Sequence, residues 1–124
     1  MIERLTPPGS PVPKGPYSPV VKAGGFVFLA GQIPSEKGDI THETRQVLTN
    51  IKVMLEGVGS SIADAVKVVV YLADGADFAA MNAVYAEFFG DNKPVRTTIV
   101  CSFFADIRIE VDCTAYTPSS AHRE

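Results

Sequence analysis

The residues best suited to chemistry are an arginine and a glutamate in two segments toward the end of the chain. Arg96 follows Pro94 by two residues, and Glu110 lies within an otherwise apolar, alternating segment. A guanidinium binds a carboxylate through two parallel hydrogen bonds, and a carboxyl group shielded from water can exchange protons near neutral pH. Both residues also fit roles without chemistry. Arg96 would then form a surface salt bridge, and Glu110 would lie on a solvated strand face beside Asp112 and Thr114.

Two further polar side chains occupy informative places. Tyr17 lies in a loop framed by Pro16 and Pro19, where its ring either packs as a plug or covers a ligand. Asn82 lies in a segment with helical periodicity, where its amide either satisfies a backbone group or faces a ligand. The residues themselves leave both alternatives open.

The motifs that mark the commoner catalytic and cofactor sites are absent from the sequence. There is no G-x-G-x-x-G, no phosphate-binding P-loop and no G-x-S-x-G. The two histidines, His42 and His122, do not indicate a Ser-His-Asp or Cys-His site. The two cysteines, Cys101 and Cys113, form no C-x-x-C motif. We therefore predict neither a metal site nor a cofactor.

Length and composition favour one domain spanning residues 1–124 that associates with other copies of itself. A chain of 124 residues with 46% hydrophobic side chains carries more apolar surface than a small monomer usually exposes. The net charge of −3 argues against a nucleic-acid partner, which a basic face would indicate. No apolar run reaches the length of a membrane span, and the N-terminus lacks the apolar core of a signal peptide. The expected location is the cytoplasm.

Hydrophobic periodicity predicts the elements that must position these side chains. Six prolines between residues 6 and 19 indicate an extended lead-in. Alternation and β-branched runs predict strands over residues 20–23, 26–30, 66–72, 96–101 and 107–116, and helical spacing predicts helices over residues 41–58 and 78–90. Thr41 with Thr44 is a weak N-cap signal for the first helix, and Asp77 is the expected N-cap of the second.

The predicted order ββαβαββ is typical of an α+β fold. We expect a two-layer sandwich in which two helices cover one face of a mixed β-sheet. The opposite face of the sheet then needs cover of its own, and closed cyclic association of identical chains is the usual solution. On the functional interpretation Glu110 would lie in an interface cleft, where burial raises the pKa of its carboxyl group.

Six short sequence motifs lie along the chain in a specific order and spacing. They are GPYS at 15–18, GQIP at 31–34, NIK at 50–52, MNAVYAEFF at 81–89, KPVRTT at 93–98 and IRIEV at 107–111. Each motif alone is weak, but the set is specific. Through it the chain resembles the Rid (reactive intermediate deaminase) family, also called YjgF-like proteins, over nearly its whole length.

This resemblance implies a chorismate-mutase-like homotrimer with sites in the clefts between subunits. It also implies a reaction: 2-aminoacrylate and 2-aminocrotonate tautomerise to imines, and water is added at the imine carbon to release ammonia and a 2-keto acid, without a cofactor. By the same similarity Arg96 would bind the substrate carboxylate, and Glu110 would position or deprotonate the attacking water. The pocket would be lined by Tyr17, Gly31, Asn82 and the backbone around Thr98.

Two positions depart from the commonest family pattern, and two other functions stay open. Ala30 stands where many members carry serine, and Thr98 stands where many carry cysteine, so a different imine or a ring-derived substrate is an alternative. A trimeric protein that binds small carboxylic or keto acids without turnover is the second hypothesis. A ribonuclease-like translation inhibitor is the third, and the acidic charge and the lack of a histidine pair or basic stripe speak against it.

Overall fold

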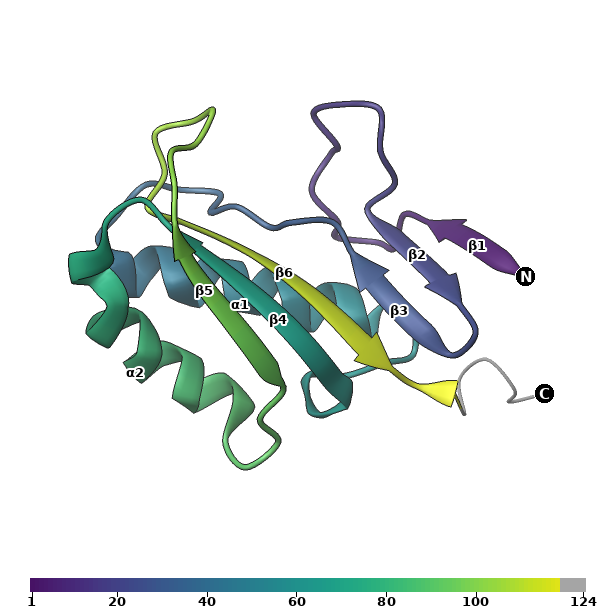
Figure 1. Ribbon diagram of the computed structural model, residues 1–124. Coiled ribbons are helices and arrows are strands. Elements are labelled where there is room, and N and C mark those ends of the chain that lie inside the picture. The colour runs from purple at the N-terminus through teal and green to yellow at the C-terminus, as the bar shows by residue number, and fades with distance from the viewer. Residues whose placement is uncertain (119–124) are drawn as a thin grey trace.

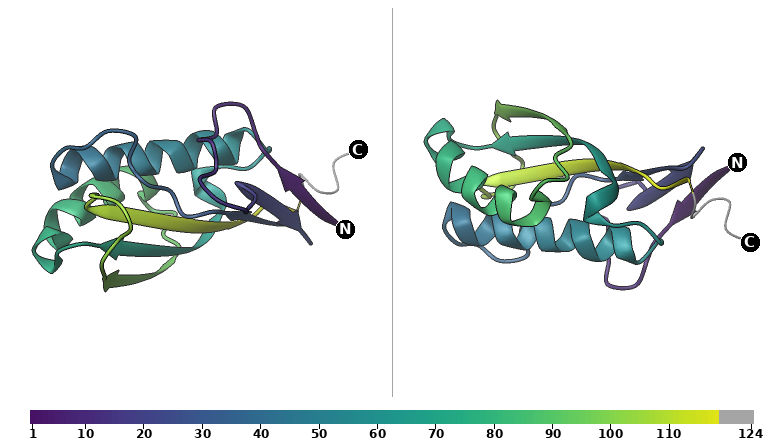
Figure 2. Two further views of the ribbon diagram at one scale, coloured as in Figure 1. Left: turned by 90° about the horizontal axis from the view of Figure 1, so that it is seen from above. Right: turned by 90° about the horizontal axis from the view of Figure 1, so that it is seen from below.

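One mixed sheet with two helices against it makes up the described part of the chain, residues 1–118, as a computed structural model shows (Figure 1). The six strands lie in the order β1-β2-β3-β6-β4-β5, and neighbouring strands are antiparallel except β4 and β5, which are parallel. Both helices lie on one face of the sheet (Figure 2). The predicted α+β two-layer sandwich is therefore confirmed.

The elements have the following bounds. The strands are β1 Ile2–Leu5, β2 Val20–Ala23, β3 Phe26–Leu29, β4 Ala65–Leu72, β5 Val95–Val100 and β6 Ile109–Tyr116. The helices are α1 Ile40–Glu56 and α2 Phe78–Phe89, with short 3₁₀ turns η1 Ile62–Asp64 and η2 Gly75–Asp77.

A glycine pair forms the hairpin between β2 and β3. Gly24 and Gly25 have φ values of 60° and 85°, in the left-handed region that a two-residue turn between right-twisted strands requires. Ala23 pairs with Phe26 across this turn. Since successive residues of a strand point to opposite faces, Val27 is buried under the helices and Phe26 is exposed on the other side.

The core lies between the sheet and α1. Apolar residues of α1 recur every three or four positions and form one stripe toward the sheet. This stripe buries Val47, Leu48, Ile51, Met54 and Leu55. From the sheet, β4 and β6 contribute every second residue, namely Val68, Val70, Leu72, Ile109, Val111, Cys113 and Ala115. The alternation predicted for residues 107–116 is confirmed, although β6 begins at Ile109.

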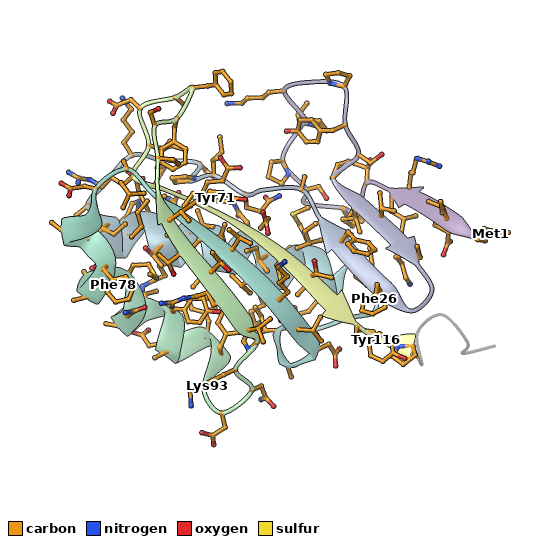
Figure 3. The ribbon with its side chains drawn as sticks, in the orientation of Figure 1. Met1, Phe26, Tyr71, Phe78, Lys93 and Tyr116 are labelled. Carbon is orange, nitrogen blue, oxygen red and sulfur yellow. The ribbon has the colours of Figure 1, made fainter. Side chains whose placement is uncertain are left out.

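The face of the sheet that points away from the helices, here named the open face, carries large apolar side chains. Phe26, Phe28, Ile99 and Tyr116 are each about two-fifths exposed there. The Phe26 ring packs against the Tyr116 ring at a centroid distance of 4.9 Å, and Figure 3 shows the two rings together at one end of the sheet. Within one chain nothing among residues 1–118 covers this face.

The start of the chain and the start of α1 differ from the sequence prediction. Strand β1 pairs with β2 ahead of the proline-rich segment; a four-residue edge strand has too little alternation to be recognised. The N-cap of α1 is Asp39, whose carboxylate accepts a hydrogen bond from the His42 backbone N–H at 2.8 Å. The proposed Thr41 and Thr44 cap is therefore wrong.

The start of α2 also differs. Asp77 precedes the helix, but its side chain makes no cap hydrogen bond. Its carboxylate instead lies 3.6 Å from the guanidinium of Arg108. A neighbouring aspartate, Asp74, accepts the backbone N–H of Ala76 and so caps the preceding 3₁₀ turn. Asp77 therefore occupies the N-cap position of α2 as expected, but the cap hydrogen bond expected from its side chain is absent.

A buried carboxylate fastens the loop before α1 to the chain that leads into β6. Glu43 is only 2% exposed. Its two oxygens accept the backbone N–H of Gly38 at 3.1 Å and that of Arg108 at 2.7 Å. Hydrogen bonds from backbone N–H groups to a carboxylate shielded from water are among the stronger polar contacts in proteins. Glu43 therefore fixes the position at which β6 enters the sheet, two residues before Glu110.

We predict that Glu43→Ala lowers the free energy of unfolding by about 3 kcal/mol, because two backbone N–H groups lose a buried acceptor. Urea denaturation at a fixed protein concentration measures this. Glu87→Ala is the matched control: Glu87 pairs with Arg45 on the exposed surface, so its loss should change stability little. Equal effects of the two substitutions would contradict the role given to Glu43.

Candidate functional site

Glu110 projects from β6 onto the open face, into a cavity of about 610 Å³. It pairs in register with Tyr71 of β4, and it alternates with the buried residues Ile109 and Val111. The cavity is lined by Lys14, Tyr17, Ala30, Gly31, Ile33, Tyr71, Cys101, Ser102, Phe103, Phe104, Ala105, Ile107 and Glu110. Three predicted site residues, Tyr17, Gly31 and Glu110, are thus brought together.

The segment after β3 holds Gly31 directly against Glu110. Gln32 and Val111 exchange two backbone hydrogen bonds, of 2.8 and 3.1 Å, which continue the pairing of β6. A Cβ atom at Gly31 would overlap the Oε2 atom of Glu110. Glycine is therefore required at residue 31 by the close approach of the Glu110 carboxylate, which itself occupies the space that a side chain at residue 31 would fill.

The surroundings of Glu110 favour its protonated form. Burial raises the pKa of the Glu110 carboxyl group, and the nearby carboxylate of Asp112 raises it further. The Tyr71 hydroxyl donates to Asp112 at 2.9 Å, which raises the pKa of Tyr71 to about 12. With its raised pKa, the Glu110 carboxyl group is suited to pick up and release a proton.

Tyr17 lies at the mouth of the cavity. Its hydroxyl accepts the backbone N–H of Lys14 at 3.3 Å, and its own backbone N–H donates to Gly15 at 2.9 Å. These two hydrogen bonds hold the proline-framed loop close to the Tyr17 ring. Because the side chain is 52% exposed, Tyr17 is not a packing plug within the chain, and its ring is free to contact a ligand in the cavity.

Arg96 lies on the opposite side of the sheet from Glu110. It pairs in parallel register with Val68, whose side chain is buried under the helices, so both point to the helix face. The guanidinium lies 4.7 Å from the ring centre of Tyr85 and 5.6 Å from that of Phe78. Within residues 1–118 no carboxylate forms a salt bridge with it, so the salt-bridge interpretation finds no support in the chain.

Thr98 and Asn82 lie on the same side as Arg96. Thr98 pairs with Val70, two residues beyond Arg96 on β5, and is half-buried. Asn82 is half-buried on α2, four residues after Phe78, and no side-chain or backbone group of residues 1–118 hydrogen-bonds its amide. The interpretation that Asn82 only satisfies a backbone group is therefore not supported. Neither residue lines the cavity at Glu110.

The predicted site residues thus form two groups. The Glu110 group, Tyr17, Gly31 and Glu110, lies on the open face, and the Arg96 group, Asn82, Arg96 and Thr98, lies on the helix side at the β5 edge. Strand β4 separates them, and their register partners on β4 are Val68 and Tyr71. Strand spacing puts the two Cα atoms about 14 Å apart, with side chains on opposite faces, so one small ligand cannot touch both within a chain.

Several cavity residues could not be recognised from the sequence. Tyr71 lies in a strand rich in β-branched residues, and its sequence context indicates only an ordinary strand residue. Its pairing opposite Glu110 is what brings it to the cavity. Cys101, Phe103 and Phe104 lie in the loop after β5, and nothing in their spacing indicates a site. His42 hydrogen-bonds Gln46 on the exposed surface of α1, and His122 lies outside the described residues.

No cluster of three histidine, cysteine, aspartate or glutamate side chains within residues 1–118 could hold a metal ion. Neither helix of this part of the chain is long and apolar enough to cross a membrane. By its side-chain chemistry, the Arg96 guanidinium can bind an anion and the Glu110 carboxyl group can exchange a proton.

Comparison with known proteins gives the family. The family model described as endoribonuclease L-PSP matches residues 8–117, which is nearly all of the chain. The chain belongs to the endoribonuclease L-PSP family. This is the YjgF/RutC family, so the resemblance to Rid proteins is confirmed.

Relatives of this family resemble the chain over nearly its full length. A RutC family protein of Pyrococcus horikoshii is 49% identical over 124 residues, covering 94% of this chain and 98% of its own. The crystal structure of yeast Mmf1 has a TM-score of 0.89 and 32% identity, covering 94% of this chain and 99% of that chain. A Yersinia pestis protein of the conserved Rid family, YyfA, has a TM-score of 0.90 and 25% identity, covering 94% and 100%.

In this L-PSP family chain we predict that Glu110 titrates above the ordinary glutamate range. Its folded-state pKa is raised, so the stability it contributes is present below the unfolded-state pKa and is lost as pH rises through the folded-state pKa. Asp112→Asn should lower the Glu110 pKa without restoring the ordinary value, because burial is the larger cause. Carbon-detected NMR titration of the carboxyl groups measures both.

Glu87 is the internal reference for this titration. Its pKa is lowered by its hydrogen bond with Arg45 on the opposite surface, and it should not respond to Asp112→Asn. A Glu110 midpoint at or below the ordinary glutamate value would contradict the environment described.

Proposed function

We propose that this protein hydrolyses reactive 2-enamine and 2-imine intermediates to 2-keto acids and ammonia, as an enamine/imine deaminase that needs no cofactor. The observation that carries the proposal is the state of Arg96. Its guanidinium is half-buried, held over two aromatic rings and without a carboxylate partner among residues 1–118. A 2-imino acid supplies the missing carboxylate, and Arg96 can bind it through two parallel hydrogen bonds.

Glu110 supports the second half of the reaction. Water adds across the C=N bond of the imine while Glu110 takes a proton from the water and returns a proton to the nitrogen. Glu110 then moves the hydroxyl proton of the carbinolamine to the nitrogen, the C–N bond breaks, ammonia leaves and the carbonyl of the keto acid forms. A carboxyl group with a raised pKa is suited to these transfers. Tyr17, Asn82 and the Thr98 backbone would complete the pocket.

The placement of the two groups supports the proposal of a homotrimer. Arg96 and Glu110 lie on opposite sides of the sheet, so we propose that one subunit supplies Arg96 and its neighbour supplies Glu110. The exposed aromatic and aliphatic side chains of the open face favour such contact, since apolar surface of this kind gains stability when another copy covers it. Cyclic closure then gives three equivalent sites between the subunits.

Two other functions can be told apart from this one. A trimer that only binds small carboxylic or keto acids would release no ammonia from freshly generated 2-aminoacrylate. The family model carries the description endoribonuclease, but the net charge is −3, which gives RNA no general electrostatic attraction.

We propose a cytoplasmic location, with Cys101 and Cys113 as free thiols; a relative from Schizosaccharomyces pombe is named as mitochondrial.

We predict that Arg96→Ala nearly abolishes imine hydrolysis and that Arg96→Lys stays strongly impaired. Lysine keeps the positive charge but cannot form the two parallel hydrogen bonds of a guanidinium with a carboxylate. The assay couples a pyridoxal-phosphate-dependent dehydratase to this protein and follows imine decay and ammonia. Calorimetry with pyruvate should show binding weakened in parallel, since the product carries the same carboxylate. Full activity and normal pyruvate binding in folded Arg96→Ala would overturn the assignment.

We also predict that two inactive variants restore activity when they assemble together. Glu110→Gln should lose about a hundredfold or more in rate while its light-scattering mass remains that of a trimer. In trimers formed from equal amounts of Arg96→Ala and Glu110→Gln chains, about one quarter of the sites combine an intact Arg96 with an intact Glu110 from the neighbour. No recovery after co-refolding would place both residues in one subunit's site or exclude the trimer.

A further inference from the structure

Three residues on one face of α2 form a cradle along the side chain of Arg96. Phe78, Met81 and Tyr85 are spaced i, i+3 and i+7, so they lie in a row on the helix surface. Arg96 donates a hydrogen bond to the Met81 sulfur at 4.0 Å, and its guanidinium lies over the rings of Phe78 and Tyr85 on either side. These are all the partners of its guanidinium within residues 1–118. Figure 3 shows Phe78 on α2, away from Tyr71 and the open face.

Tyr85 is the inner wall of this cradle. It is only 9% exposed, and its ring is itself backed by Phe89 at a centroid distance of 4.4 Å. The ring therefore cannot turn away from Arg96 without disturbing the core. Phe78 is 47% exposed and closes the outer side, where it has room to move.

The Tyr85 hydroxyl has no partner in residues 1–118 although it is buried. Burial also raises the pKa of Tyr85 to about 12, so the side chain stays neutral. A buried, unpartnered hydroxyl costs stability and cannot reach a ligand in solvent. The part of Tyr85 that can act is its aromatic face, which attracts a cation placed above it.

We propose that Tyr85 is a positioning residue for carboxylate recognition: its ring holds the guanidinium of Arg96 flat and pre-oriented, with Phe78 as the weaker outer wall. The inference rests on the proposed function in that the anion bound by Arg96 is the substrate carboxylate. An arginine that keeps its fork ordered before binding loses less conformational entropy when the carboxylate arrives. The cradle thereby raises affinity without touching the substrate.

The test uses the full-length protein and four variants. Tyr85→Phe keeps the ring and removes the unpartnered hydroxyl. Tyr85→Leu removes the ring, and Phe78→Leu removes the exposed ring, whose loss does not threaten folding. Phe89→Leu is the matched control, because it removes a buried ring of the same helix that touches Tyr85 and forms no cation–π contact with Arg96.

Two readouts are taken on each variant. The first is the NMR signal of the Arg96 Nε–H group, which a ring below the guanidinium shifts upfield. The second is the dissociation constant for pyruvate by calorimetry, together with KM and kcat for imine hydrolysis. A cation–π contact of ordinary strength corresponds to about a threefold to thirtyfold change in affinity.

We expect Tyr85→Leu to lose the upfield shift of Arg96 and to weaken pyruvate binding and raise KM within that range, with a smaller effect on kcat. Phe78→Leu should show the same direction at smaller size. Tyr85→Phe should keep the shift, the affinity and the KM of the wild type. Phe89→Leu should lower thermal stability and leave the KM within about twofold of wild type, since the cation–π contact is kept.

The inference fails if the Arg96 signal and the pyruvate affinity of Tyr85→Leu and Phe78→Leu match the wild type, or if Phe89→Leu raises KM as much as Tyr85→Leu does. It also fails if Tyr85→Phe is impaired like Tyr85→Leu, because the hydroxyl would then be the acting group. The NMR readout needs no turnover. A wild type that hydrolyses no imine while Tyr85→Leu still loses the Arg96 shift would overturn the proposed function and leave the positioning role of Tyr85 intact.

Discussion

The alternation of side chains across a sheet that has helices on only one face decides where each functional group can lie. Residues at even positions of β6, such as Glu110 and Asp112, point away from the helices, while the intervening Ile109 and Val111 enter the core. A shift of one residue in the pairing of β6 with β4 would bury the carboxylates and expose the core. The buried side chains therefore hold the register, and the register holds the carboxylates on the open face.

The same constraint explains why the site residues are divided. Arg96 is paired beside Val68, a helix-side position, whereas Glu110 is paired beside Tyr71, an open-face position. No rotamer change can carry a side chain through a hydrogen-bonded sheet. On the proposed function, a ligand that needs both groups lies where two chains meet, and the apolar open face and the unpartnered Arg96 both belong to that interface.

Local packing then tunes each group separately. The Gln32–Val111 backbone bridge brings Gly31 against Glu110, and the missing side chain makes room for the Glu110 carboxylate, whose pKa is raised by burial. On the other side of the sheet, α2 supplies two aromatic rings and no carboxylate to Arg96. On the proposed function, Glu110 is suited to proton exchange and Arg96 to binding a fixed negative charge.

The sequence by itself determined the fold class, the approximate extent of seven of the eight main elements, and the residues worth testing, because hydrophobic periodicity and short motifs are local properties of the chain. It did not determine the edge strand β1, which is too short to show a pattern, or that the Asp77 side chain lies near Arg108 and makes no cap hydrogen bond. Nor could it tell that Tyr71 lines the cavity of Glu110 or that Arg96 lies on the other face of the sheet. Strand order and register join residues far apart in the chain, so only the tertiary structure decided which side chains meet.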